Sequence, residues 1–418
     1  MINLKIKKYL PLTVTAAVLI CTILFSAISN SKAPMTFMNN SVIDDSSSAN
    51  NLSATNDNAN LKDEEMKGVW VTYMELSMEN EEDKSEKRFR EKFTEIAENS
   101  KESGFNTLIV QVRPFCDALY ESEFFPYSHI LTGSQGQNPG YDALKIMCEI
   151  CKSYDLKIHA WVNPYRVAVS KTPSELSDNN PYIIDNSLGF ETEGGIYLDP
   201  SNEKTRQLII NGIEEIVRNY NVDGIQFDDY FYPNDINDCD NQSYEKYREK
   251  FGNNCMSIDD WRKANVNLLV SEVYRTVHKT KENVVFGISP QGNIDNNDGL
   301  YADVKSWCTC GGYIDYICPQ IYFSIDNPKL KFEDSLESWL NLEFADNVTM
   351  YVGLAGYKAG SNKDDGTWLN SNDILATEYE ILQKYDKVNG FMLYSYSSLF
   401  EEDAAEEVET LREVITTV

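Results

Sequence analysis

Two adjacent aspartates, Asp228 and Asp229, are the residues of this chain best placed for acid–base chemistry. They lie in a stretch, 224–233, that is typical of a β-strand, and the aromatic run 230–232 follows them directly. Two carboxyl groups can protonate a leaving oxygen and supply or activate a nucleophile, as hydrolysis of a glycosidic bond requires. Adjacent strand residues point to opposite faces, so one aspartate is expected to reach the substrate while the other orients a neighbour. A turn with a helix N-cap is the structural alternative.

Polar and aromatic residues also end several other expected strands. Aromatic faces stack on sugar rings, amides bind hydroxyl groups, and a guanidinium can hold a carboxylate through two parallel hydrogen bonds. The structural alternatives are a buried imidazole for His159, ion pairs for the arginines, and plain packing for the tyrosines and Gln320. The candidate substrate-binding residues are Arg113, Asp117, His159, Trp161, Asn163, Arg166, Tyr230, Tyr232, Gln320, Tyr322 and Tyr394.

Other hydrolytic chemistry is poorly represented in the sequence. No serine lies in a G-x-S-x-G pattern, and the chain has only three histidines, His129, His159 and His278. A Ser-His-Asp triad and a His-rich metal centre are therefore disfavoured, and no metal or cofactor is predicted. The acidic, Asn-rich stretch 234–254 lacks the spacing of an EF-hand loop, although a bound cation there is an alternative.

Eight short runs rich in β-branched and aromatic residues set the expected architecture. The predicted strands are 67–75, 106–115, 157–166, 224–233, 284–291, 313–323, 349–358 and 390–398. Amphipathic stretches between most of them predict helices at 89–103, 141–154, 202–220, 258–280, 373–385 and 402–416. For the helix at 202–220, Asp199 and Pro200 are expected to supply the N-cap and the first turn.

This alternation predicts an α/β fold, a closed (β/α)8 TIM barrel with long inserts after strands 3 and 4, at 167–195 and 234–257. An open doubly wound sheet is the alternative, but no Gly-rich phosphate loop follows any strand. In a barrel the carboxyl ends of all strands meet at one rim. The candidate residues would therefore face one cleft.

Composition restricts the classes of function. The 418 residues include 66 acidic and 37 basic ones, a formal net charge of −29, which disfavours nucleic-acid binding. The 42% hydrophobic content is sufficient for a large core. Nine cysteines are too few for a disulfide scaffold. Free thiols are expected, with a Cys239–Cys255 disulfide or a metal at Cys148 and Cys151 as alternatives.

The N-terminal part is expected to form a separate region. Lysines precede an apolar run over residues 9–28, which predicts an uncleaved membrane anchor or a cleaved signal peptide over 1–28. The polar, Asn- and Ser-rich stretch 29–65 predicts a disordered linker. The barrel domain, 66–418, would then lie outside the cytoplasm, anchored to the cell surface or secreted.

A series of short motifs follows one another along the chain between about residue 67 and residue 398. They are 67–70 (KGVW), 111–114 (QVRP), 117–120 (DALY), 131–133 (LTG), 139–142 (PGYD), 159–166 (HAWVNPYR), 198–200 (LDP), 223–233 (DGIQFDDYFYP), 288–290 (ISP) and 319–322 (PQIY). In these motifs and their order the sequence resembles the bacterial glycosyl hydrolase-like family 10. The resemblance implies a (β/α)8 barrel that hydrolyses glycans of the bacterial envelope, including peptidoglycan strands stripped of their stem peptides. It also adds Tyr120 to the candidate substrate-binding residues.

The fourth strand is also similar to the amylase-type pattern, which implies that Asp228 is the nucleophile. That pattern has a glutamate after the fifth strand, where this chain has Ser289-Pro290-Gln291. The general acid is therefore open among Asp229, Asp117, Glu75 and Asp295, in that order. Two arginines, Arg113 and Arg166, could hold the lactyl carboxylate of a peptide-free muramic acid. A non-catalytic carbohydrate-binding barrel and a polysaccharide deacetylase are the other functions considered.

Overall fold

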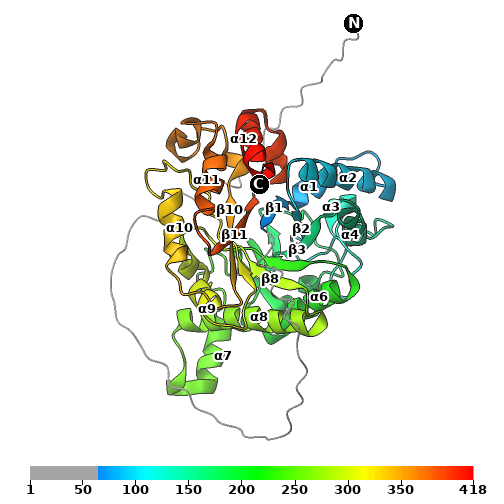
Figure 1. Cartoon of the computed structure of the whole chain (residues 1–418). Helices are drawn as coiled ribbons and strands as arrows, with labels where there is room; N and C mark the ends of the chain where they lie inside the picture. The colour runs from blue at the N-terminus through cyan, green and yellow to red at the C-terminus, as the bar shows by residue number, and fades with distance from the viewer. Residues whose placement is uncertain (1–64, 418) are drawn as a thin grey trace, which may run out of the picture. The chain divides into compact units, whose positions relative to one another are not determined.

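Eight parallel strands close into a barrel in the computed structural model, which describes residues 65–417 (Figure 1). The barrel strands are β1 (Met66–Val71), β2 (Thr107–Arg113), β3 (Lys157–Val162), β7 (Gly224–Phe227), β8 (Val285–Ile288), β9 (Tyr316–Ile317), β10 (Thr349–Leu354) and β11 (Val388–Leu393). Each strand pairs with its neighbours in chain order, and β11 closes the ring against β1. This confirms the predicted (β/α)8 barrel and excludes the open sheet.

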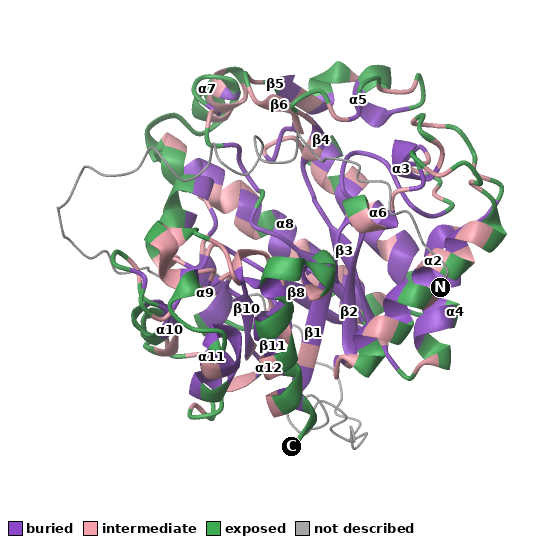
Figure 2. Ribbon diagram, turned by 90° about the horizontal axis from the view of Figure 1, so that it is seen from above, coloured by how far each residue is buried: buried purple, intermediate pink, exposed green. Residues whose placement is uncertain are grey.

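Helices surround the strands because each has one apolar stripe to bury. Figure 2 shows the strands buried at the centre and the helices exposed on their outer faces. In α6 the stripe is Ile209, Ile213, Ile216 and Val217, all buried. The helices are α1 (Tyr73–Leu76), α2 (Glu86–Glu102), α3 (His129–Thr132), α4 (Ala143–Ser153), α5 (Pro181–Ile184), α6 (Glu203–Asn219), α7 (Asn241–Phe251), α8 (Ile258–Thr280), α9 (Val304–Thr309), α10 (Phe332–Leu340), α11 (Ile374–Leu382) and α12 (Ala405–Thr416).

The strands are shorter than predicted at their carboxyl ends. β1 stops at Val71, because Thr72 and Glu75 form a capping box that begins α1. β7 ends at Phe227, one residue before the aspartate pair. These early ends turn the last residues of the predicted strands into rim loops above the barrel.

The predicted N-cap of the helix after the third strand is wrong. The Oδ1 atom of Asp199 accepts hydrogen bonds from the backbone N–H and the hydroxyl of Ser201, at 2.8 and 2.7 Å, within a turn. The helix α6 begins at Glu203, and Asn202 caps it by accepting from the N–H of Lys204 at 2.9 Å. The turn at Asp199 therefore places the N-cap three residues later than predicted, whereas the helix itself begins one residue after the predicted start.

Both predicted inserts are present on the rim. The first holds α5 and a three-stranded antiparallel sheet of β4 (Arg166–Val169), β5 (Gly189–Glu191) and β6 (Gly195–Leu198). The second holds α7, which stands away from the barrel in Figure 1, and the 3₁₀ helix η3 (Gly252–Asn254). All eight cysteines within residues 65–417 are free thiols, so the Cys239–Cys255 disulfide is not formed.

The predicted anchor or signal peptide over 1–28 lies outside the described residues, as does all but the last residue of the predicted linker. Within residues 65–417, no helix has the length and apolar character needed to cross a bilayer.

Candidate active site

Asp228 lies over the mouth of the barrel and leans toward β3. It follows Gly224 and Gln226 on the inward face of β7, where the Gln226 amide oxygen accepts from the Trp70 indole at 2.6 Å. Its Oδ2 atom accepts hydrogen bonds from the Trp161 indole N–H at 3.1 Å and from the Asn163 amide. Its Oδ1 atom accepts from the backbone N–H of Tyr230 at 3.3 Å. Only 4% of Asp228 is exposed, so three N–H donors replace the water around this carboxyl group.

Asp229 leans to the opposite side, toward the ends of β8 and β9. Its Oδ2 atom accepts from the Gln291 amide, and its Oδ1 atom accepts from the Gln320 amide at 3.3 Å. Gln320 also donates to the Ser289 carbonyl at 2.9 Å, which fixes the amide between two strand ends. Asp229 is likewise 4% exposed. The two carboxyl groups thus start from adjacent residues and diverge across the barrel mouth.

The environment favours a proton on this pair near neutral pH. Burial raises the pKa of Asp228 to about 7, and the negative charge of Asp229 adds to this shift. Burial also raises the pKa of Asp229, against the hydrogen bond from Gln291. Two adjacent carboxylates in a water-poor site resist double ionisation. The pair can therefore hold one proton and one negative charge, as acid–base chemistry at neutral pH requires.

Arg166 brings a positive charge to the same site. Its Nε atom donates to the Pro114 carbonyl at 2.7 Å, and its Nη2 atom donates to the Asn163 side chain at 2.9 Å. Its guanidinium lies 4.9 Å from the ring centroid of Phe115 and 5.5 Å from that of Tyr230. Its charge lowers the pKa of Asp228, in opposition to burial. Its Nη1 atom makes no hydrogen bond within residues 65–417, so it is available to an anionic group of a ligand.

Tyrosine rings form a wall beside the carboxyl groups. Tyr322, Tyr357 and Tyr394 form a mutual cluster with ring centroids 5.8 Å apart in each pair, and Tyr394 lies 6.0 Å from Trp70. Tyr230 is 48% exposed, and the charge of Asp229 raises its pKa. Such rings offer apolar faces with hydroxyl groups at their edges, which suits a sugar ligand.

Seven of the predicted substrate-binding residues thus surround the pair, and two further residues were missed. The seven are Trp161, Asn163, Arg166, Tyr230, Gln320, Tyr322 and Tyr394. The sequence prediction left out Gln291, which holds Asp229, and Tyr357, which completes the wall. Gln291 ends one predicted strand and Tyr357 is the next-to-last residue of another, so the rule that selected the other residues could have found both.

Arg113 lies away from the aspartate pair, contrary to the prediction. It is 1% exposed, with its guanidinium 4.4 Å from the ring centroid of Phe125. A Cβ atom on Gly212 of α6 would lie 2.5 Å from its Nη1 atom, so the side chain packs between the barrel wall and that helix. The register of β2 against β3 shifts between Gln111 and Arg113, which turns Arg113 outward. The expected clamp of two arginines on a carboxylate is therefore wrong.

Four other predicted residues have structural contacts away from the pair. His159 lies deep in the barrel, where its Nδ1 atom is 3.0 Å from the Tyr316 hydroxyl, and burial lowers its pKa to about 3. Asp117 is fully buried and accepts from Gln135 at 3.0 Å. Tyr120 and Tyr232 are at most 1% exposed and pack within the hydrophobic core.

The other proposed acids are also engaged elsewhere. Both carboxylate oxygens of Glu75 are bound, Oε2 by the Thr72 N–H and Oε1 by the Ser397 N–H and the Ser395 hydroxyl. Asp295 is exposed in the first turn of the 3₁₀ helix η4 (Ile294–Leu300) and makes no hydrogen bond with either aspartate of the pair. Asp229 is therefore the only one of the four candidates that lies beside Asp228.

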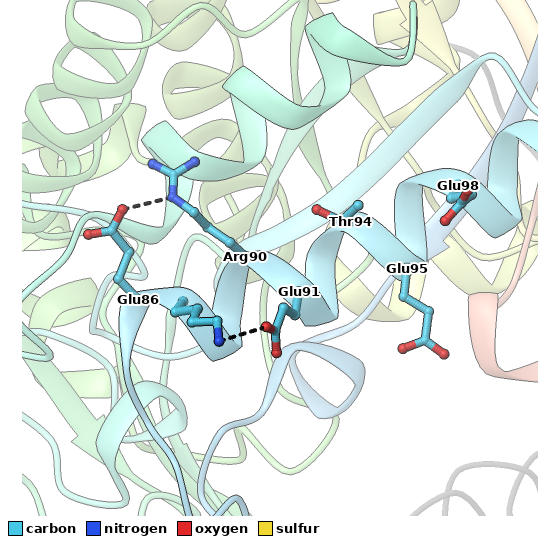
Figure 3. A pocket seen from close by; sticks show the side chains of 7 residues that line it. Glu86, Arg90, Glu91, Thr94, Glu95 and Glu98 are labelled. Atoms are coloured by element: carbon cyan, nitrogen blue, oxygen red, sulfur yellow. Dashed lines mark hydrogen bonds and ion pairs between the residues drawn. The ribbon is translucent and has the colours of Figure 1, made fainter.

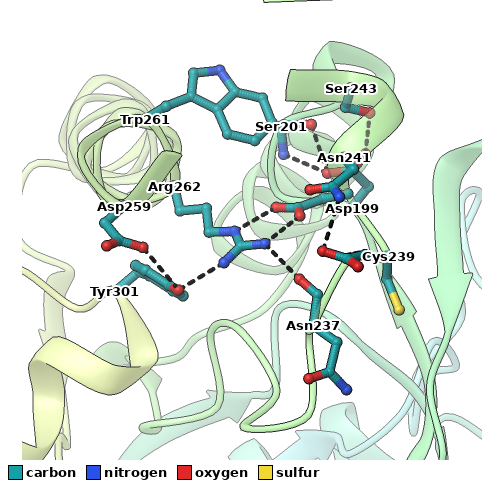
Figure 4. Close-up of polar contacts among 12 residues, drawn as sticks. Asp199, Ser201, Asn237, Cys239, Asn241, Ser243, Asp259, Trp261, Arg262 and Tyr301 are labelled. Atoms are coloured by element: carbon teal, nitrogen blue, oxygen red, sulfur yellow. Dashed lines mark hydrogen bonds and ion pairs between the residues drawn. The ribbon is translucent and has the colours of Figure 1, made fainter. Parts of the chain in front are cut away.

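Two other charged regions differ from this site. The outer face of α2 has an open hollow lined by Glu86, Arg90, Glu95 and their neighbours, in which exposed ion pairs face solvent (Figure 3). In the insert after β7, Arg262 joins Asp240, Tyr301 and the Asn237 carbonyl (Figure 4). The first region is solvated and the second is internally satisfied, so neither offers a free buried acid.

Comparison with known proteins identifies the family of this chain. The sequence model of the family described as glycosyl hydrolase-like 10 matches residues 65–370. Glycosyl hydrolase YngK of Bacillus subtilis (strain 168) is 33% identical over 359 residues, which cover 81% of this chain and 69% of that protein. Glycosyl hydrolase DigH of Escherichia coli (strain K12) is 31% identical over 320 residues, which cover 70% of this chain and 72% of that protein.

Two solved structures share the fold at low identity. The glycoside hydrolase domain of PgaB (BpsB) from Bordetella bronchiseptica aligns with a TM-score of 0.58 at 10% identity, over 84% of this chain and 99% of that chain. Alpha-L-fucosidase isoenzyme 2 from Paenibacillus thiaminolyticus aligns with a TM-score of 0.53 at 11% identity, over 84% and 49%. At this identity the likeness concerns the barrel alone.

Proposed function

We propose that this chain, which belongs to the glycosyl hydrolase-like 10 family, is a glycosidase that cleaves glycan strands of the bacterial cell envelope outside the cytoplasm. The proposal rests on the Asp228–Asp229 pair, two buried carboxyl groups at the barrel mouth beside an aromatic wall. Asp228, which the amylase-type pattern implied to be the nucleophile, is here assigned as the acid instead of Asp229, because its pKa of about 7 keeps it partly protonated at neutral pH and able to give a proton to the leaving oxygen. The three N–H donors around it then stabilise the carboxylate that remains.

Peptidoglycan strands without stem peptides are the substrate we favour. Removal of the peptide exposes a lactyl carboxylate on each muramic acid. Arg166 lies beside Asp228 and Tyr230, and its Nη1 atom is bound by no residue of 65–417. The guanidinium also counters the repulsion that an acidic protein would exert on such a polyanion. A single arginine replaces the pair expected from the sequence.

The test of the function is release of reducing ends from purified peptidoglycan treated with an amidase that removes the stem peptides. The full chain should release reducing ends from these strands, and release from untreated peptidoglycan should be slower because the peptides block the cleft. Tight binding to the strands with no release would instead indicate a carbohydrate-binding barrel. A chain that neither binds nor cleaves the strands would exclude this substrate.

The role of Arg166 can be tested separately with the substitution Arg166→Met. We expect KM to rise by about 10- to 100-fold on carboxylated strands, since one charge-assisted hydrogen bond of about 1.5–3 kcal/mol is lost. On carboxyl-reduced strands the same variant should lose much less. Equal losses on both substrates would show that Arg166 does not bind the carboxylate.

A further inference from the structure

The position of the two carboxyl groups limits the mechanism. A glycosidase that uses two enzyme carboxylates places them on opposite sides of the scissile bond. Here both carboxyl groups belong to consecutive residues at the end of one strand, β7, and the neighbouring strand ends supply amides, a guanidinium and aromatic rings. Gln291, at the end of the fifth barrel strand, has an amide where the amylase-type pattern has a carboxylate.

The remaining acids do not supply the missing group. Glu75 has both oxygens bound by the backbone and by Ser395, and Asp117 is fully buried beside His129 and Gln135. Asp295 is exposed and makes no hydrogen bond to the pair within residues 65–417. The face of the sugar opposite the acid is thus left without an assigned enzyme nucleophile.

We propose that the nucleophile is the carbonyl oxygen of the substrate's own 2-acetamido group, so that the sugar on the non-reducing side of the cleaved bond must be a 2-acetamido-2-deoxy sugar. The inference rests on the proposed glycosidase function and deepens it. Asp228 acts as acid and base, and Asp229 accepts the acetamido N–H. The acetamido oxygen can replace an enzyme carboxylate, because an intramolecular nucleophile has an effective concentration far above that of water.

The reaction balances in two steps. In the first, the acetamido oxygen bonds to C1 while the C1–O bond to the leaving sugar breaks, the Asp228 proton passes to the leaving oxygen, and Asp229 takes the N–H proton to give a neutral oxazoline. In the second, water attacks C1, the C1–oxazoline oxygen bond breaks, Asp228 takes a proton from the water, and Asp229 returns its proton to the nitrogen. The net change is addition of one water, with retained configuration at C1.

The surroundings of the pair suit an acetamido group. Gln291 and Gln320 hold Asp229 from two strand ends, so its carboxylate is fixed before the ligand binds. Trp161 donates its indole N–H to Asp228, and Tyr394 packs against the aromatic cluster of the barrel interior. Indole and phenol faces beside the carboxyl groups provide an apolar surface for the acetamido methyl group.

The experiment compares four samples of the same amidase-treated strands. They are native, N-deacetylated, deacetylated and re-acetylated, and deacetylated and trifluoroacetylated strands. Deacetylation removes the nucleophile and fluorine weakens it, so release by the full chain should fall by about 10²-fold or more on the second and fourth samples. Re-acetylation should restore it. Equal release from all four samples would overturn this inference and leave the glycosidase function intact, whereas no release from any sample would overturn both.

A binding measurement tests the role of Asp229 without turnover. The thiazoline of N-acetylglucosamine is a stable analogue of the cyclic intermediate, and its affinity for the full chain can be measured by calorimetry. Asp229→Asn should weaken this affinity by at least about tenfold, since the proton that Asp229 shares with the ring nitrogen is lost, and with it a charge-assisted hydrogen bond. Asp295→Asn, an exposed control on the same rim, should not change it. Unchanged affinity in Asp229→Asn, or a first product with inverted C1 configuration, would contradict the mechanism.

Discussion

Two buried aspartate sites on the rim of the barrel differ in what surrounds them. In the insert after β7, the Asp240 carboxylate accepts a hydrogen bond from Nε of Arg262 at 2.7 Å. Arg262 also donates a hydrogen bond to the Tyr301 hydroxyl at 2.7 Å (Figure 4). Burial lowers the pKa of the Arg262 guanidinium, but these hydrogen bonds and the charge of Asp240 raise it by more. At the mouth of the barrel, Asp228 and Asp229 receive only neutral N–H groups at hydrogen-bond distance, and their pKa values rise.

The difference separates a structural carboxylate from a reactive one. A buried carboxylate matched by a guanidinium has a fixed charge, and it joins two segments of chain. A buried carboxyl group matched by amides keeps a proton that it can release, at some cost in stability. The same change from aspartate to asparagine should therefore lower activity but not stability at the barrel mouth, and lower stability but not activity in the insert.

The largest effect is expected for Asp228→Asn at the barrel mouth. It should lower kcat on amidase-treated strands by about 10²–10⁴-fold or more, because no proton is available for the leaving oxygen. The variant should nevertheless unfold in urea at the same concentration as the parent chain or a higher one at pH 8, since a buried charge is removed. Asp295→Asn is the matched control on activity. Undiminished release by Asp228→Asn would refute the assignment of the acid.

Asp240→Asn in the insert is expected to lower the stability of the chain and to leave its activity unchanged. Loss of one partner leaves the Arg262 guanidinium buried without its counter-charge, which should cost about 3–5 kcal/mol in the free energy of unfolding. The folded fraction should keep its kcat, because Asp240 does not face the aspartate pair. A double variant, Asp240→Asn with Arg262→Met, should recover part of the stability. A loss of kcat without a loss of stability would remove the distinction between the two sites.

The sequence predicted which face of a strand a side chain lies on better than it predicted how deep in the barrel that side chain lies. Alternation along the predicted strand 157–166 puts His159, Trp161 and Asn163 on one face, and all three side chains turn to the inner side of the barrel. Only Trp161 and Asn163 reach the carboxyl pair, because His159 lies a layer deeper, where a Cβ atom on Gly224 would be 2.7 Å from its Nδ1 atom. Depth depends on where the barrel closes, and no local pattern of residues encodes that.

Arg113 shows a second limit of the sequence. By alternation it should share a face with Gln111, whose amide donates to Asn163 at 2.6 Å beside the site. The register shift between these two positions reverses the direction of the side chain. Such irregularities depend on pairing with the neighbouring strand. The barrel, its inserts and the aspartate pair were thus predictable from strand runs and motifs. Which other residues surround the pair depends on how each strand pairs with its neighbour, and the sequence alone does not give that.

A smaller effect is expected in the pH dependence of stability. The folded-state pKa of Asp228 is raised to about 7 from an ordinary value of 3.8, so the folded chain binds the proton more tightly than the unfolded chain. Stability from this group is therefore present below about pH 4 and is lost as pH rises toward 7. Between about pH 5 and 7 the parent chain should lose about 1–3 kcal/mol relative to Asp228→Asn, as measured by urea unfolding. Parallel curves would show that Asp228 titrates normally.

The smallest effect is expected on the outer face of α2, which tests whether burial sets these differences. Arg90 pairs with Glu86 at 2.7 Å and with Glu149 at 3.0 Å, distances similar to those of Arg262, but its side chain is 40% exposed (Figure 3). Water already solvates these charges, so Arg90→Ala should cost only about 0.2–1 kcal/mol in unfolding free energy and leave kcat unchanged. Because salt screens exposed pairs, this small loss should shrink further in about 1 M NaCl, whereas the loss in Asp240→Asn should persist. If Arg90→Ala lowered the unfolding free energy as much as Asp240→Asn does, the stability that each ion pair contributes would depend on its number of contacts and not on the exclusion of water.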